Sequence, residues 1–240
     1  MKFLKKIFNG FQIFLIAIYT VISATLGVVF LLFGKEKAVK WASFIWSNLI
    51  FKTLGIKLVI RDPHPKSFYW ETTRIYVSNH ESNLDIPALF LSTPRALFFL
   101  AKRELKNVPF MGWYMQLVGM IFINRGDRNQ AQQSLKRAGD EIKKGKNILS
   151  FPEGTRTRTG EMGVFKRGTF RLALQNKIPI IPIAIKGARE CIPAKKFEIN
   201  PGTIYVNIGE PVYPNDWEVS EVDKFAFHVR EEVKKLRAEL

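Results

Sequence analysis

The chain has 240 residues, of which 47% are hydrophobic and 24% are charged, a balance that excludes intrinsic disorder and allows a large buried core. Lysine and arginine number 37 against 21 acidic residues, so the formal net charge is +16. Such a surface favours phosphate-bearing partners, which are nucleic acid, anionic lipid or an acidic carrier. The single cysteine, Cys191, excludes an internal disulfide, and with only three histidines beside it we expect no metal site.

The first predicted element is an apolar segment from residue 11 to residue 33, which carries no charge and is long enough to cross a bilayer. It exceeds the usual apolar region of a secretory signal peptide. Lysines flank it on both sides, so the positive-inside rule selects no orientation. Two interpretations stay open: a single membrane span, or a hairpin that re-enters one leaflet or lies in its plane, with residues 41–55 as second arm. The hairpin is slightly favoured, and both interpretations predict a membrane-associated protein.

After Gly55, short β-branched runs alternate with helical patterns. Strands are predicted at residues 56–60, 74–78, 96–101, 120–124, 147–151, 180–185 and 203–208, and helices at 86–91, 109–118, 127–144, 166–175 and 220–239. The alternation predicts an α/β fold in which helices flank a mostly parallel sheet. We therefore expect two parts: a membrane-associated two-helix element at 1–55 and an α/β domain at 56–240. Ser220 and Asp223 are expected to form a capping box for the last helix.

Polar residues that can take part in chemistry follow three of the predicted strands. His80 follows the second strand, Arg125 follows the fourth, and the segment 152–156 follows the fifth. Because open α/β sheets place their sites at the carboxyl ends of the strands, these residues are predicted to share one edge.

His80 and Asp85 have the chemistry of a general base and the carboxylate that orients it. The alternative is a histidine at a strand end and an unrelated helix cap. The chain has no GxSxG motif, and no recognisable motif surrounds Cys191, so His80 would activate a hydroxyl group of a substrate. Arg125, Arg156 and the glycine-containing turn before Arg156 are typical of phosphate binding, although a solvated basic loop would look similar.

Four ordered blocks resemble the glycerolipid acyltransferases: NHxxxxD at 79–85, GxxFIxR at 119–125, FPEGTR at 151–156 and IPxxP at 178–182. Within that family the sequence looks most like the members whose acceptor is 1-acyl-glycerol-3-phosphate. The resemblance implies transfer of a fatty acyl group from coenzyme A or acyl carrier protein to that lysophosphatidic acid, making phosphatidic acid in phospholipid biosynthesis. The thioester is a co-substrate, and no further cofactor is implied.

The resemblance also implies roles for individual residues. His80 would be the base and Asp85 its orienting partner. Lys102, Arg125 and Arg156 would bind the acceptor phosphate, and Glu153, Gly154 and Thr155 would shape the acceptor pocket. The IPxxP block would bind the acyl chain, although a packing role is about as plausible for prolines near a strand start. Lys166 and Arg167 would add to a basic rim.

Two alternatives to this function stay open. The acceptor could be glycerol-3-phosphate or another lysophospholipid. A different class of protein, a basic non-catalytic membrane adaptor, would explain the charge but not the ordered motifs. Nucleic acid is not an expected partner, because the aromatic residues lie in apolar runs instead of alternating with basic ones. The expected location is a membrane, with the catalytic domain on the cytoplasmic side, which in a bacterium is the inner membrane.

Overall fold

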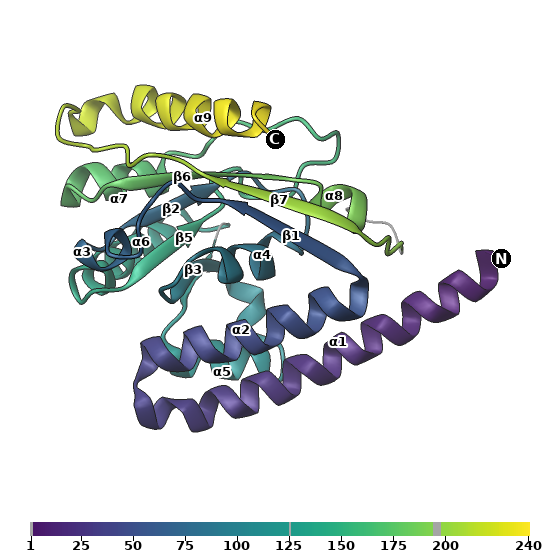
Figure 1. Cartoon of the computed structure of the whole chain (residues 1–240). Coiled ribbons are helices and arrows are strands. Elements are labelled where there is room, and N and C mark those ends of the chain that lie inside the picture. Colours follow the sequence, from purple (N-terminus) through teal and green to yellow (C-terminus); the bar gives the residue numbers. More distant parts are fainter. Residues whose placement is uncertain (1, 125, 194–197) are drawn as a thin grey trace.

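A computed structural model describes residues 2–124, 126–193 and 198–240 (Figure 1). Its described residues form a seven-stranded sheet in the order β1-β7-β6-β2-β5-β3-β4. The strands are β1 (Ile56–Arg61), β2 (Ile75–Ser78), β3 (Leu97–Lys102), β4 (Ile121–Ile123), β5 (Asn147–Ser150), β6 (Ile180–Lys186) and β7 (Gly202–Ile208). Neighbouring strands pair in parallel, except that β6 and β7 are antiparallel. The expected α/β fold with a mostly parallel sheet is confirmed.

Helices surround this sheet on both faces. They are α1 (Lys2–Phe30), α2 (Lys35–Leu54), α3 (Phe68–Glu71), α4 (Asp85–Ser92), α5 (Met111–Val118), α6 (Arg128–Lys143), α7 (Gly168–Asn176), α8 (Ala188–Cys191) and α9 (Val222–Ala238), with short 3-10 turns η1 (Leu31–Phe33), η2 (Arg103–Asn107) and η3 (Val219–Glu221). The helices α3 and α8 were not predicted, because a single helical turn has no measurable periodicity.

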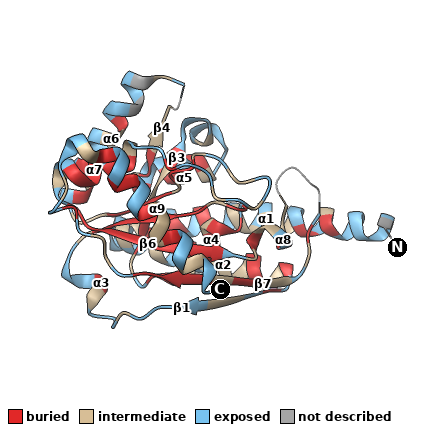
Figure 2. Cartoon of the chain, turned by 90° about the horizontal axis from the view of Figure 1, so that it is seen from above, coloured by how far each residue is buried: buried red, intermediate tan, exposed pale blue. Residues whose placement is uncertain are grey.

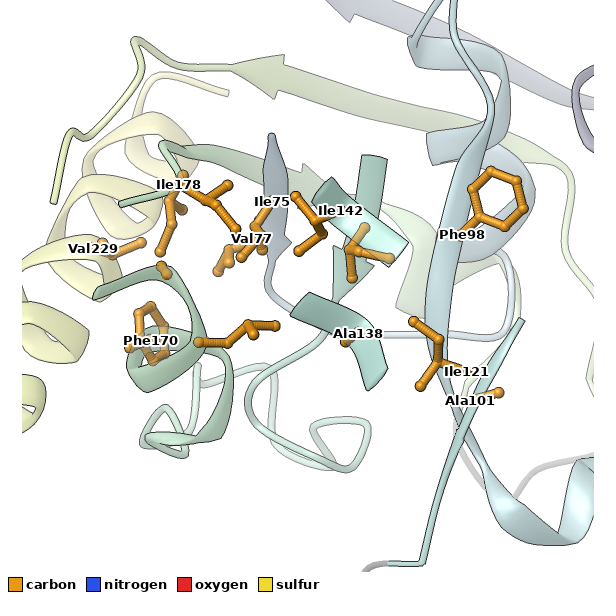
Figure 3. Close-up of a cluster of buried hydrophobic side chains, with 14 of the residues drawn as sticks. Ile75, Val77, Phe98, Ala101, Ile121, Ala138, Ile142, Phe170, Ile178 and Val229 are labelled. Carbon is orange, nitrogen blue, oxygen red and sulfur yellow. The ribbon is translucent and has the colours of Figure 1, made fainter. Parts of the chain in front are cut away.

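Two hydrophobic cores lie on the two faces of the sheet. Because side chains alternate along a strand, Ile75 and Val77 of β2 enter one core while Tyr76 enters the other. Figure 3 shows the first core, in which the β2 residues meet side chains of α6, α7 and α9 such as Phe170 and Val229. The second core joins the sheet to α2 and α4. The two cores make the sheet a rigid platform for the loops at its edge.

The helices α1 and α2 run side by side as a hairpin beneath the sheet (Figure 1). The turn between them contains Gly34, whose φ of 95° favours glycine. Polar side chains of α1 face α2: Gln12 Nε2 donates to the carbonyl of Thr53 at 2.8 Å. On α2, Lys40 donates to the carbonyls of Phe90 and Thr93, which joins the hairpin to the end of α4.

Many large apolar side chains of α1 are exposed, and Figure 2 shows the N-terminal end of this helix projecting from the molecule, largely in the colour of exposed residues. The segment Phe3–Phe33 is long and apolar enough to cross a membrane, and only 17% of its most apolar window is buried. This low burial distinguishes it from the core helix of a soluble protein. The helix therefore supports membrane association, while the choice between a span and an in-plane hairpin stays a prediction.

One local expectation was wrong. The capping box before α9 is formed by Glu218 and Glu221, not by Ser220 and Asp223, because a 3-10 turn precedes the helix and moves the cap toward the N-terminus. Pro182 is the third residue of β6, near the start of the strand as the sequence predicts. Its missing N–H is tolerated because the antiparallel pairing with β7 begins one residue later, at Ile183.

Candidate active site

His80 and Asp85 meet at the carboxyl end of β2. Nδ1 of His80 lies 2.7 Å from Oδ2 of Asp85, and the aspartate is completely buried as the first residue of α4. The same oxygen accepts the backbone N–H groups of Glu81 at 2.6 Å and Ser82 at 2.9 Å. Oδ2 of Asp85 therefore acts only as an acceptor, toward two backbone N–H groups and the imidazole. An ionised Asp85 requires the proton of His80 on Nδ1, which leaves the lone pair on Nε2.

Contacts from other elements fix the turn that carries His80. The side-chain amide of Asn79 donates to the carbonyl of Ile185 on β6 at 2.9 Å and accepts its N–H at 2.8 Å. Ser82 Oγ donates to the carbonyl of Ile192 at 2.9 Å. The turn is therefore held on both sides of the histidine, so the position of the imidazole does not depend on solvent-exposed contacts.

The FPEGTR loop, residues 151–156, forms the second wall of the site. It follows β5, the neighbour of β2 in the sheet. The ring of Phe151 stacks on His80, with centroids 4.2 Å apart and planes inclined by 19°. Glu153 accepts the N–H of His80 on Oε1 at 2.7 Å and the N–H of Gly163 on Oε2 at 2.8 Å. Burial raises the pKa of Glu153, against the lowering effect of these two N–H donors.

The acceptor-pocket residues of this loop differ in their surroundings. Gly154 has a φ of 75°, and a Cβ atom there would lie 2.7 Å from Nζ of Lys166. Glycine is favoured here for two reasons: it adopts the positive φ of the turn, and it leaves room for the side chain of Lys166, which covers the loop. Thr155 is exposed. Arg156 is half-buried, and its guanidinium makes no hydrogen bond or ion pair within the described part of the chain.

Of the other two predicted phosphate ligands, only Lys102 lies among the described residues. Lys102, at the end of β3, is exposed and pairs with Glu104 at 3.2 Å. It makes no hydrogen bond to the histidine–aspartate pair. Arg125 lies outside the described residues. Lys166 was expected only in the basic rim of the site. The structure places its side chain directly against Gly154 of the FPEGTR loop.

The cysteine and the second histidine have structural surroundings. Burial raises the pKa of the Cys191 thiol to about 11, so the thiol stays protonated at neutral pH. His64 stacks on Phe68 and bonds to the carbonyl of Gly209, which is a structural role. Over the described residues, no group of three histidine, cysteine or acidic side chains is placed to hold a metal.

A His–Asp pair with a buried aspartate lies at a strand end and is braced by the FPEGTR loop of the neighbouring strand, and this arrangement defines the class of protein. The sequence pattern of the Acyltransferase family matches residues 59–186, and the chain belongs to this family. It is an acyltransferase.

Named relatives narrow the class. The chain is 34% identical to the 1-acyl-sn-glycerol-3-phosphate acyltransferase of Saccharomyces cerevisiae, over 84% of this chain and 67% of that protein. It is 27% identical to the enzyme of that name from Salmonella typhimurium, over 96% and 93% of the two chains. The crystal structure of the 1-acyl-sn-glycerophosphate (LPA) acyltransferase PlsC from Thermotoga maritima superposes with a TM-score of 0.81 at 26% identity, covering 98% of this chain and 95% of that one. The chain spans only 42% of the Brassica napus relative and 58% of the Arabidopsis thaliana relative.

Proposed function

We propose that the protein transfers a fatty acyl group from a thioester to the free hydroxyl of 1-acyl-glycerol-3-phosphate, which makes phosphatidic acid. The observation that carries this proposal is the 2.7 Å contact between His80 and Asp85. It leaves Nε2 of the histidine available as a base, next to the FPEGTR loop with its proposed phosphate ligand Arg156. The names of the relatives support the choice of acceptor.

The chemistry requires few groups from the protein. Nε2 of His80 takes the proton of the acceptor hydroxyl while that oxygen attacks the thioester carbonyl carbon. The C–O bond forms, the C–S bond breaks, and the imidazolium returns the proton to the departing sulfur. A thiol has a pKa of about 8.5, so the thiolate leaves without a strong acid. Asp85 holds the imidazole in the required tautomer and stabilises its charged form.

The acceptor phosphate binds near the FPEGTR loop in this proposal. Arg156 supports it, because a half-buried guanidinium without an ion-pair partner among the described residues can form a bidentate contact to phosphate. Lys166 covers Gly154 and adds a second positive charge. Glu153 serves the pocket as a brace, since both of its oxygens accept backbone N–H groups. Lys102 and Arg125 remain proposed phosphate ligands.

The exposed apolar surface of α1 supports a membrane location for the reaction. An acceptor with one fatty acyl chain resides in a bilayer, so an enzyme attached there meets it at high local concentration. A cytoplasmic orientation gives access to coenzyme A or acyl carrier protein, both of which are acidic and suit the net charge of +16.

An acceptor panel tests this function. The purified protein in lipid nanodiscs is supplied with acyl-coenzyme A or acyl carrier protein, together with lysophosphatidic acid, glycerol-3-phosphate or lysophosphatidylethanolamine. We expect phosphatidic acid to form fastest. The His80→Ala variant should lose about 10²–10⁴-fold in kcat, which is the usual contribution of a general base. Full activity of this variant would refute the mechanism, and preference for another acceptor would refute the substrate assignment. Binding of nanodiscs without any acyl transfer would favour the membrane adaptor.

A further inference from the structure

An ion pair directly beside the catalytic turn has no role in the mechanism above. Arg237, in the last turn of α9, donates to Oε1 of Glu81 from Nη2 at 2.6 Å and from Nε at 3.1 Å. Glu81 is only 2% exposed and lies between His80 and Ser82 in the turn. The two residues are 156 positions apart in the sequence, so this contact connects the last helix to the site.

A second arginine of α9 reaches the other wall of the site. Arg230 donates to the carbonyl of Gly163 at 2.9 Å and to that of Met162 at 2.8 Å. The N–H of Gly163 in turn bonds to Glu153. Arg230 and Arg237 are about two helical turns apart and therefore lie on one face of α9.

These contacts form a closed ring. On one side, Arg237 bonds to Glu81, and the backbone N–H of the adjacent His80 bonds to Glu153. On the other side, Glu153 bonds to Gly163, and Gly163 bonds to Arg230. The helix α9 connects Arg230 to Arg237 and closes the ring. The backbone N–H of Glu81 also bonds to Asp85, so a shift of this residue would disturb the carboxylate that orients His80. A rigid helix closes the ring, because α9 packs into the first hydrophobic core through Phe225, Val229 and Val233.

We propose that α9 braces the active site and that Arg237 is a positioning residue, which holds the turn at His80 in its reactive geometry through Glu81. This proposal rests on the function proposed above. Removing one member of a buried ion pair leaves the other charge uncompensated. Without Arg237, the Glu81 carboxylate would face Asp85 and Glu190 unopposed, which favours either its protonation or a movement of the turn toward water.

Kinetics of four variants in nanodiscs test the brace: Arg237→Met, Glu81→Gln, the double variant and Arg237→Lys. Arg237→Met should lower kcat at least tenfold while the KM of the acceptor changes less than twofold, because the proposed role of Arg237 is to hold the turn at His80 and not to bind the acceptor. The double variant should recover part of this loss, since no buried charge is left unpaired. Arg237→Lys should also recover part of it. The control is Lys235→Met, which removes an exposed ion pair of the same helix, with Glu232 at 2.6 Å, and should leave kcat unchanged.

A spectroscopic readout separates this proposal from the proposed function. The chain has only three histidines, so ¹⁵N-histidine labelling gives a spectrum in which the downfield Nδ1 proton of His80 can be assigned with His80→Ala. We expect that resonance to shift or disappear in Arg237→Met and to persist in Lys235→Met. An unchanged resonance with unchanged kcat would overturn the brace, whatever acceptor the wild-type protein uses. A wild-type protein inactive on lysophosphatidic acid would refute only the substrate assignment.

Discussion

The backbone N–H of His80 donates a hydrogen bond of 2.7 Å to Oε1 of Glu153. This contact joins the NHxxxxD turn to the FPEGTR loop, although the two residues are 73 positions apart. Glu153 accepts a second N–H, that of Gly163, on its other oxygen. A carboxylate is therefore the side chain that this position requires, because both of its oxygens must accept.

Glu153→Gln should weaken both the fold and the activity. An amide can accept only one of the two backbone N–H groups, and its own NH₂ would face the other donor. We expect a loss of about 1–3 kcal/mol in the free energy of unfolding, the usual cost of a buried unsatisfied group, and a lower kcat. Urea denaturation and initial rates measure these two effects. Glu161→Gln, at an exposed position of the following loop, is the control. Equal stability of the two variants would contradict the bracing role.

Arg156→Ala should raise the KM of the phosphate-bearing acceptor by tenfold or more and change the KM of the acyl donor much less. The reason is that a guanidinium contact to phosphate contributes binding of the acceptor alone. Arg158→Ala is a matched control two residues away, because Arg158 is exposed. Steady-state kinetics with each substrate varied in turn measure the KM of the acceptor and the KM of the acyl donor separately. A parallel increase of both KM values would assign Arg156 a different role.

The free energy of unfolding should fall as the pH rises from about 4.5 toward about 7. Burial raises the pKa of Glu81 from 4.5 to about 7, although Arg237 opposes the shift. Between these values the folded state holds a proton that the unfolded state has lost, so raising the pH favours unfolding. Glu81→Gln removes this titration and should flatten the slope. The pKa of Glu153 is raised as well, so part of the pH dependence of the free energy of unfolding should persist in this variant. Urea denaturation of both proteins at pH 5, 6 and 7 measures this pH dependence. The same pH dependence in Glu81→Gln as in the wild-type protein would refute a raised pKa of Glu81.

Charged substitutions on the exposed face of α1 should weaken binding to lipid. Phe8 and Phe11 are 57% and 54% exposed, and a carboxylate at either position would oppose insertion of that face into a bilayer. We expect Phe8→Asp/Phe11→Asp to reduce co-flotation with anionic vesicles. Phe227→Asp, at a residue 62% exposed on α9 across the sheet from α1, is the control (Figure 1). Equal losses in both variants would indicate general misfolding, and no loss in either would contradict a membrane role for this face.

Local sequence pattern was sufficient to predict most of the helices and strands of this protein. Alternating β-branched runs and helical periods predicted the strands, the longer helices and the parallel sheet, because hydrophobic periodicity is a property of neighbouring residues. Parallel strands end at one edge, so the meeting of His80 with the FPEGTR loop also followed from chain order. The turns of α3 and α8 were missed, since four residues carry no period.

The distant residues that support the site could be identified only from the packing of the folded chain. Nothing near Arg237 or Arg230 in the sequence distinguishes them from the many other basic residues of the chain. Their roles depend on how α9 packs against the sheet, which brings two guanidinium groups to the two loops at its edge. The same holds for Lys166 over Gly154 and for the buried Glu81. Local pattern decides which elements form, whereas the packing of those elements decides which charges become buried and paired.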